Sequence, residues 1–510
     1  MTHAPMGSAP VAPTASRAMP AADQATSAIV LYDTALASGT RSRLGRLCQR
    51  GALLLPVANK PIVQYIMDTL ARSGIRKVTF AGTDQVSCDA LSMYLASGTR
   101  NAPKNMSVNV VCDASCGKSS VNLIRRVLAV DAQNDLSVAL EGHVRHDDVL
   151  VVGSLFVSPS DADLSLQGQL LYHKVKRAAV TMLLSPAVAD DNGEYMTREY
   201  VAVRPDGVVA AYCPAGTSKS SDIKIPQVAL LSHQDDDGRG LKLRKDVTDM
   251  RVYVFNRETL SRVLEENEGL VDVQKHLIPY FVRLTAVQSA RSGMFSSSMG
   301  SNVSVTGTTG VRQGIHRALD RMSSSNLSGS GGDTDRGVDG DGSLSKWRTG
   351  VHAYVQGATP SAGTMGAIGS LASSSSPPSA MMIIDSDSSY ANVNRDILRY
   401  LERSEIAKGV KLGAKAAVNT SIVAGGSALG DRSSVKRSVL GPNCMIGSSA
   451  KILNSILHEG AEVGDGCQVH NSILCRGVKL EAKSSLKDCI VGPNAKVTGG
   501  NYKNEELFDE

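Results

Sequence analysis

Several short stretches of this sequence carry residue types that bind phosphate, and their spacing can be tested. The segment CGKSS at 116–120 has the Gly, Lys and Ser that end a phosphate-binding loop. That loop needs another glycine five positions before Gly117, where Cys112 stands, so the motif fails. Four arginines between 41 and 50 could attract phosphate, although a charged run on a loop is more often simply solvated.

Histidines and cysteines are the next candidates for chemistry. His458 and His470 could serve as the general base of an acyltransferase, but no motif for a thioester cofactor accompanies them, so we expect surface histidines. The nine cysteines form no CxxC pair, which disfavours a zinc ribbon and a disulfide framework. We therefore expect no metal, no cofactor and a reducing compartment.

Composition limits the classes of partner. The formal net charge is only +5 in 510 residues, and aromatic residues make up 4% of the chain. Neither a nucleic acid nor an anionic membrane is therefore expected as the main partner. No apolar stretch is long enough to span a membrane, and residues 1–27, rich in Ala, Pro and Ser, are expected to form a disordered tail.

Residues 28–286 alternate short apolar runs with amphipathic stretches, which predicts an α/β domain. The clearest helix is PIVQYIMDTLARSG at 61–74, and the expected strands are SAIVLY, RKVTFAG, VNVVC, DDVLVVGSLFV and RAAVTMLL. Residues 287–345 are rich in Ser and Gly and predict a low-complexity insert. Residues 346–403 should complete the first domain, with a strand at HAYVQ, a second low-complexity run and a linking helix.

A repeat of 17 residues runs from Ile406 to Val497. Three columns, spaced 6, 6 and 5 and beginning at Ile406, Leu412 and Val418, hold Val, Ile or Leu at all seventeen positions. Such spacing predicts a left-handed parallel β-helix with three short strands per coil over residues 404–498. We expect between five and six coils, followed by a tail at 499–510.

One outward column of this β-helix is apolar, and we call it the apolar stripe: Ile422, Val439, Ile456, Ile473 and Ile490. Outward positions elsewhere include Glu462, Lys479, Lys496, Lys451 and Gln468. An exposed stripe would be a large apolar patch for a monomer, so we interpret it as a partner surface. The alternative is that the insert or the preceding domain covers it.

LASGTRSRL at 36–44 and LLLPVANKP at 53–61 resemble the sugar nucleotidyltransferase family. That family has a G-G-x-G-T-R loop, a P-K-x-L-L-P-V-x-x-K-P segment and a strand that ends in an acidic metal ligand. The resemblance assigns a relic nucleotide pocket to four matching residues: Gly39, Thr40, Arg41 and Lys60.

The family pattern is lost at four other positions. Leu36 and Ala37 replace loop glycines, Ala52 replaces the phosphate-neutralising lysine, and Ser154 replaces the acidic ligand. Side chains in the loop crowd amides that should approach a triphosphate, and a hydroxyl is a poor substitute for a carboxylate on a hard cation. The resemblance therefore implies a degenerate site without nucleotidyltransferase activity.

Longer sequence blocks indicate which group of related proteins the chain resembles most. DVTDMRVYVF (246–255) and VDVQKHLIPYFVRLT (271–285), with GDRSSVKRSVLGPNCMIG (430–447) and SSLKDCIVG (484–492), resemble the gamma-type subunits of eukaryotic translation initiation factor 2B. The epsilon type carries a further helical domain for nucleotide exchange, which we do not expect here.

That resemblance implies a function based on assembly. The chain would be a non-catalytic regulatory and scaffold subunit of the guanine-nucleotide exchange factor for translation initiation factor 2, located in the cytosol. Its partners would be an epsilon-type catalytic subunit and the other subunits of initiation factor 2B, with factor 2 as substrate of the complex. The alternatives are a sugar-nucleotide pyrophosphorylase and a β-helix acyltransferase.

Overall fold

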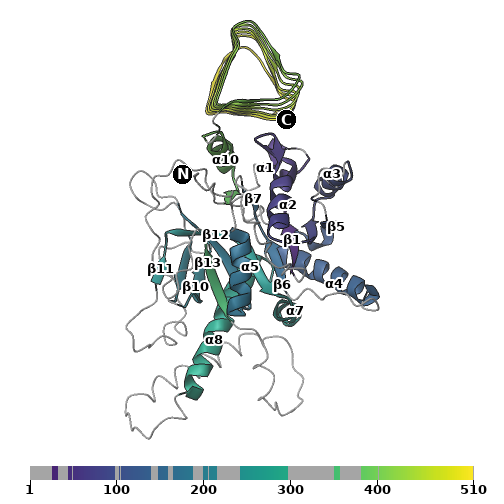
Figure 1. The fold of residues 1–510 in the computed structure, drawn as a ribbon, viewed down its shortest axis with the longest axis vertical. Coiled ribbons are helices and arrows are strands. Elements are labelled where there is room, and N and C mark those ends of the chain that lie inside the picture. Colours follow the sequence, from purple (N-terminus) through teal and green to yellow (C-terminus); the bar gives the residue numbers. More distant parts are fainter. Residues whose placement is uncertain are drawn as a thin grey trace, which may run out of the picture.

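The computed structural model shows two structured parts, an α/β domain and a triangular β-helix (Figure 1). It describes residues 26–32, 44–48, 50–97, 103, 105–138, 148–158, 165–187, 199–204, 206–214, 242–296, 350–356, 381–399, 401 and 403–508. The predicted fold class, an α/β domain followed by a parallel β-helix, is confirmed.

The first domain is built on a seven-stranded sheet with the order β13-β8-β12-β6-β1-β4-β5. Only β12 runs antiparallel to its neighbours. The strands are β1 (Thr26–Leu31), β4 (Lys77–Gly82), β5 (Ser107–Cys112), β6 (Asp148–Val152), β8 (Val180–Pro186), β12 (Val247–Asn256) and β13 (Val351–Val355). The HAYVQ segment thus returns to the first domain as an edge strand that pairs with β8.

Helices cover both faces of this sheet because its strands are apolar on both sides. In β1, Ala28 and Val30 face one core, and Ile29 and Leu31 face the other. The first core is covered by α2 (Ile62–Arg72), α3 (Gln85–Ala96) and α5 (Ser165–Lys176), with the short α1 (Leu44–Leu47) and η2 (Ala52–Leu54) beside them. The second is covered by α4 (Ser120–Val138), α7 (Arg257–Glu266) and α8 (Ile278–Ser296), with η5 (Val273–Leu277) before α8.

Smaller elements complete the domain. They are the hairpin β2 (Pro56–Val57) and β3 (Lys60–Pro61), η3 (Ala114–Cys116), the pair β7 (Leu155–Val157) and β14 (Met382–Ile384), and the sheet of β9 (Tyr200–Val203), β10 (Val209–Cys213) and β11 (Lys242–Arg244). Helix α8 continues to Ser296, so the low-complexity insert expected from residue 287 does not begin there. Helix α10 (Asp387–Arg399) leads into the β-helix.

The β-helix has three faces, and each is a parallel sheet in which strands pair 17 residues apart. Face one is β15 (Glu405–Ile406), β18 (Ile422–Val423), β21 (Val439–Leu440), β24 (Ile456–Leu457), β27 (Ile473–Leu474), β30 (Ile490–Val491) and β33 (Glu506–Leu507). Face two is β16 (Lys411–Leu412), β19 (Ala428–Leu429), β22 (Met445–Ile446), β25 (Glu462–Val463), β28 (Lys479–Leu480) and β31 (Lys496–Val497). Face three is β17 (Ala417–Asn419), β20 (Ser434–Lys436), β23 (Lys451–Leu453), β26 (Gln468–His470), β29 (Ser485–Lys487) and β32 (Asn501–Lys503).

The residue columns behave as the repeat predicts, with one correction at the end. Inward residues such as Val435 and Leu440 are fully buried, and a Cβ on Gly447 would lie 2.6 Å from the backbone nitrogen of Asp465 in the next coil. Strands β32 and β33 add to the stack beyond Val497. The expected tail at 499–510 is therefore wrong for most of its length, because Tyr502 and Leu507 continue the inward columns without the 17-residue spacing.

Candidate functional site

Ser154 stands where the resemblance places a metal-binding carboxylate, two residues after the end of β6. Its side chain is buried, and its hydroxyl donates a hydrogen bond of 2.7 Å to the carbonyl oxygen of Met250. Beside it, the N–H of Gly153 donates to the carbonyl oxygen of Arg251 at 2.8 Å. The strand end is thus tied to β12, and the Ser154 hydroxyl serves as a structural donor.

A buried polar network surrounds Asp249 at this same edge of the sheet. The hydroxyls of Tyr212 and Tyr253 donate to Asp249 Oδ2 at 2.7 and 2.5 Å. The backbone N–H of Arg251 donates to Asp249 Oδ1 at 2.8 Å, where β12 bulges and Arg251 has a φ of 55°. Both carboxylate oxygens of Asp249 are therefore occupied by donors of the protein itself.

Glu199 is the second carboxylate of the network. It accepts hydrogen bonds from the backbone N–H of Asp249 at 2.9 Å and from the Gln274 side-chain amide at 3.1 Å. Burial, together with the neighbouring Asp249 carboxylate, raises the pKa of Glu199 to about 7. Burial also raises the pKa of Asp249, against the opposing effect of its tyrosine donors. The pair holds protons more tightly than ordinary carboxylates do.

Such a network fits a structural role better than metal binding, because its oxygens already accept hydrogen bonds. Within the described residues, no group of three or more His, Cys, Asp or Glu side chains could hold a metal ion. Sequence reasoning missed Glu199 and Asp249. Asp249 gave a signal, since it interrupts the apolar run VTDMRVYVF, whereas Glu199 gave none.

The other predicted pocket residues are not brought together in the described structure. Lys60 Nζ lies 2.5 Å from Asp68 Oδ2 and 4.4 Å from the centre of the Tyr65 ring, so its charge has a local partner. Ala52 is buried in η2. Gly39, Thr40 and Arg41, with the lost positions Leu36 and Ala37, lie outside the described residues. The relic nucleotide pocket stays a prediction.

The apolar stripe is covered by the chain's own first domain. Ile422, Val439, Ile456 and Ile473 are buried and Ile490 is partly buried. One apolar cluster continues from β1 through α2 and α10 to the β-helix. The interpretation of these five residues as a surface for a separate partner is therefore wrong, and the alternative of cover by the preceding domain is correct. An apolar stripe beside a neighbouring domain loses its exposure to water when the two dock.

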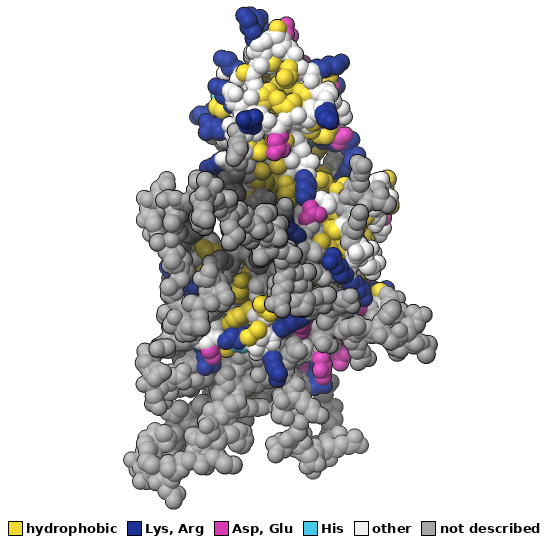
Figure 2. Space-filling model, viewed as in Figure 1, with side chains coloured by type: hydrophobic (Ala, Val, Ile, Leu, Met, Phe, Trp, Pro, Cys, Tyr) yellow, Lys and Arg dark blue, Asp and Glu magenta, His cyan; other side chains and the backbone are white. Residues whose placement is uncertain are grey.

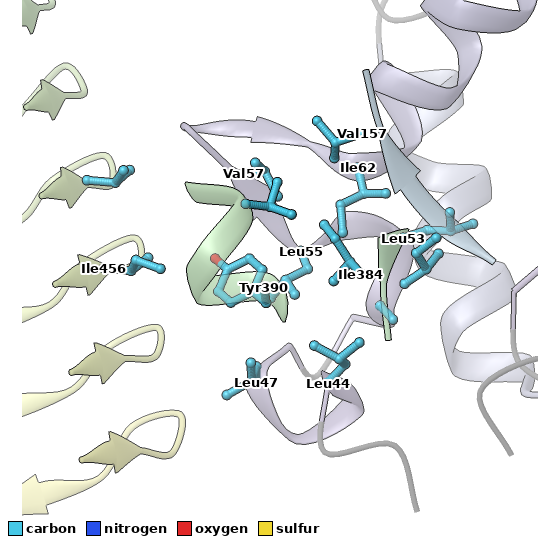
Figure 3. Close-up of a cluster of buried hydrophobic side chains, with 14 of the residues drawn as sticks. Leu44, Leu47, Leu53, Leu55, Val57, Ile62, Val157, Ile384, Tyr390 and Ile456 are labelled. Atoms are coloured by element: carbon cyan, nitrogen blue, oxygen red, sulfur yellow. The ribbon is translucent and has the colours of Figure 1, made fainter. Parts of the chain in front are cut away.

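Helix α10 and the β2–β3 hairpin make this contact. Figure 3 shows Ile456 pointing from the β-helix toward Tyr390, with Leu55 and Val57 next to the ring. The hydroxyl of Tyr390 donates to the carbonyl oxygen of Pro56 at 2.6 Å and lies 2.9 Å from Nε2 of His458. The hydroxyl therefore connects the hairpin, α10 and the fourth coil of the β-helix.

The hairpin turn adds a direct bond to the β-helix backbone. Ala58 and Asn59 have φ values of 48° and 63°, as a two-residue turn between antiparallel strands requires. This turn directs the Asn59 side-chain amide to the carbonyl oxygen of Leu440 at 2.8 Å. At the other side of the turn, the Ala58 N–H donates to Asn394 Oδ1 of α10 at 2.9 Å.

His458 differs from its predicted state. It is buried, not at the surface, and burial lowers its pKa to about 4. Because the Tyr390 hydroxyl gives its proton to Pro56, the neutral His458 ring donates from Nε2 to that hydroxyl. A neutral ring enclosed by the domain contact has no access to a substrate, so His458 fits a structural role. His470 is only partly buried and lies on face three.

Comparison with protein families identifies the C-terminal part. Residues 402–501 match the family model of the EIF2B subunit epsilon LbH domain. The β-helix of this chain is similar to that LbH domain. The match covers about a fifth of the chain and agrees with the left-handed β-helix expected from the repeat. Comparison with curated proteins gives no match.

Two further observations concern the cysteines and the helices of this chain. All nine cysteines are free thiols. Among the helices of the described residues, none combines the length and the apolar character that crossing a bilayer requires.

Proposed function

We propose that this eIF2B-type chain is a non-catalytic regulatory and scaffold subunit of the guanine-nucleotide exchange factor for translation initiation factor 2. It pairs with an epsilon-type catalytic subunit and takes the place of the gamma subunit. Its work is to hold surfaces in fixed positions, so it needs no cofactor. We place it in the cytosol, in agreement with nine free cysteines.

The strand end at Ser154 is the observation that carries the proposal. A nucleotidyltransferase needs a carboxylate there for Mg²⁺, and Ser154 instead donates its hydroxyl proton to the Met250 carbonyl. The two carboxylates of the adjoining network, Asp249 and Glu199, are buried and bound by neighbouring donors. This arrangement supports a domain retained for its shape, and it speaks against a sugar-nucleotide pyrophosphorylase.

The choice of the gamma type rests on sequence blocks in the first domain. The block DVTDMRVYVF forms β12 with its buried network, and VDVQKHLIPYFVRLT forms η5 and the start of α8. The matched family model, however, is that of the epsilon subunit. An experiment must therefore distinguish a gamma-type subunit from an epsilon-type subunit.

The test is affinity purification of the tagged full chain from its own cells, with assays of the purified chain and of its complex. We expect an epsilon-type subunit to co-purify, and we expect GDP release from factor 2 to be accelerated by the complex and unchanged by the chain alone. The same two samples are then incubated with Mg²⁺, a nucleoside triphosphate and a sugar phosphate. Neither should form a nucleotide sugar.

Each contrary result points to a different function. Exchange activity in the chain alone would identify an epsilon-type catalytic subunit. Nucleotide-sugar formation would show that other residues replace the carboxylate lost at Ser154. A homotrimer that binds a thioester cofactor would identify an acyltransferase, against the burial of His458.

A further inference from the structure

The positive charge of this protein is concentrated in the β-helix. Residues 403–508 contain 14 Lys and Arg against nine Asp and Glu, which equals the formal surplus of +5 in the whole chain. The remaining sequence is therefore balanced. Figure 2 shows Lys and Arg side chains gathered around the outside of the prism. A surplus confined to one rigid part makes a stronger local field than the same charge spread over the chain.

Within the β-helix, face three holds the largest positive surplus, because face two sets one Glu against its three outward Lys. None of its twelve outward strand positions is acidic, and Lys436, Lys451, Lys487 and Lys503 are exposed on it. Arg437 follows directly after Lys436 and is also exposed. We call these five residues the basic face. In the described structure, none of them forms an ion pair.

The neighbouring surfaces differ from the basic face. On face two, Lys479 Nζ lies 2.9 Å from Glu462 Oε1, and at a corner Arg476 Nε lies 3.2 Å from Glu459 Oε2. Face one is covered by the first domain. One acid, Asp488, follows Lys487 at the corner position equivalent to that of Arg437, and it accepts a hydrogen bond from the side-chain amide of Asn471. The five exposed cations outnumber this single carboxylate, so the basic face keeps a positive surplus.

The spacing of these cations suits an extended chain. Coils stack at about 4.8 Å, so Lys436 and Lys487, three coils apart, are separated by roughly 14 Å along the prism, and Lys503 is one coil further. Side chains on one side of an extended peptide recur at about 7 Å. Every second residue of an acidic segment could therefore reach a cation of this face.

The polar residues of face three favour a peptide over a nucleic acid as the anionic partner. Its outward strand positions carry no Phe, Tyr or Trp for base stacking, but they include Asn419, Gln468 and Asn501. These amides donate and accept hydrogen bonds, which matches a peptide backbone and not a phosphate chain that only accepts.

We propose that the basic face, Lys436, Arg437, Lys451, Lys487 and Lys503, binds an extended acidic segment of a protein partner. The binding is electrostatic, with polar side chains of face three contacting the backbone of the segment. The proposal does not depend on the proposed function, since it uses only the charge and geometry of the β-helix.

The test uses the full chain and a fluorescent peptide of alternating Glu and Ser, followed by anisotropy at low and physiological salt. The double variant Lys436→Glu/Lys487→Glu should weaken binding by at least about tenfold, and wild-type binding should weaken as salt shortens the Debye length. Lys411→Glu/Lys496→Glu, on face two, changes the net charge by the same amount and should weaken binding by less than about threefold.

Three results would overturn the proposal. Equal weakening by both double variants would mean attraction to the overall charge and not to this face. Tighter binding of an oligouridylate of equal negative charge would identify a phosphate backbone as the ligand. An unchanged anisotropy of the peptide at low salt would exclude the site.

Discussion

Replacing Ile456 with lysine should separate the β-helix from the first domain and leave the prism folded. Ile456 is 5% exposed and points outward from its coil toward Tyr390. Loss of its packing costs about 2–5 kcal/mol, and a lysine there must also be desolvated or give up its proton. We expect the contact to lose about 4 kcal/mol, which is roughly a thousandfold in the docking equilibrium.

Amide hydrogen exchange of the full chain is the suitable assay, because it reports each part separately. Amides of α10 and of the β2–β3 hairpin should exchange up to about a thousandfold faster in Ile456→Lys. Amides inside the coils should keep their protection, since Ile456 pairs with the neighbouring strands at Val439 and Ile473 through backbone bonds that the substitution leaves in place.

Met445→Lys is the matched control. Met445 also points outward from a strand of the β-helix, but it lies on face two and is 58% exposed. Its replacement should leave the exchange of α10 unchanged. Unaltered protection of α10 in Ile456→Lys, or an equal loss in Met445→Lys, would refute the assignment of the stripe to the domain contact.

Three further outcomes are expected. Tyr390→Phe leaves two buried polar partners unsatisfied, and denaturant unfolding should show a loss of about 2–4 kcal/mol. His458 has a pKa of about 4 in the fold against 6.5 unfolded, so acidification from pH 6.5 to 4 should remove about 3 kcal/mol of its contribution. The stability of the His458→Asn variant should fall less on acidification. The acid sensitivity that remains is expected from His352, whose pKa burial also lowers to about 4. Glu199, whose pKa of about 7 lies above its ordinary value of 4.5, contributes stability at low pH that is lost as the pH rises from about 4.5 to 7. Glu199→Gln should flatten the unfolding free energy between about pH 4.5 and 7, and an unchanged slope would contradict the assigned burial.

The β-helix could be predicted from sequence because every coil repeats the same local rule. The 17-residue spacing in the sequence predicts the inward columns, the glycine bends and the three strands of each coil. The rule weakens at the two ends of the stack, where Ile406 and Leu412 lack a preceding coil and are exposed, and where Tyr502 and Leu507 break the spacing.

The contact made by the apolar stripe could not be predicted in the same way. A column of Ile and Val indicates that another surface packs on it, but the sequence does not show whether that surface belongs to another chain or to the preceding domain. The deciding partners, Tyr390 and the turn at Ala58 and Asn59, lie far from the stripe in sequence. The network of Glu199 and Asp249 was hidden for a similar reason, since its members come from separate strands.

The bond between Asn59 and Leu440 has a consequence for how the chain is made. The two residues are 381 positions apart, and a ribosome adding about 5–20 residues per second needs roughly 20–80 s to cover that distance. During this interval the Asn59 side chain of the nascent chain lacks its acceptor, the carbonyl oxygen of Leu440. The stripe is synthesised after the domain that covers it, so this order of synthesis shortens the time for which the apolar stripe is open to aggregation.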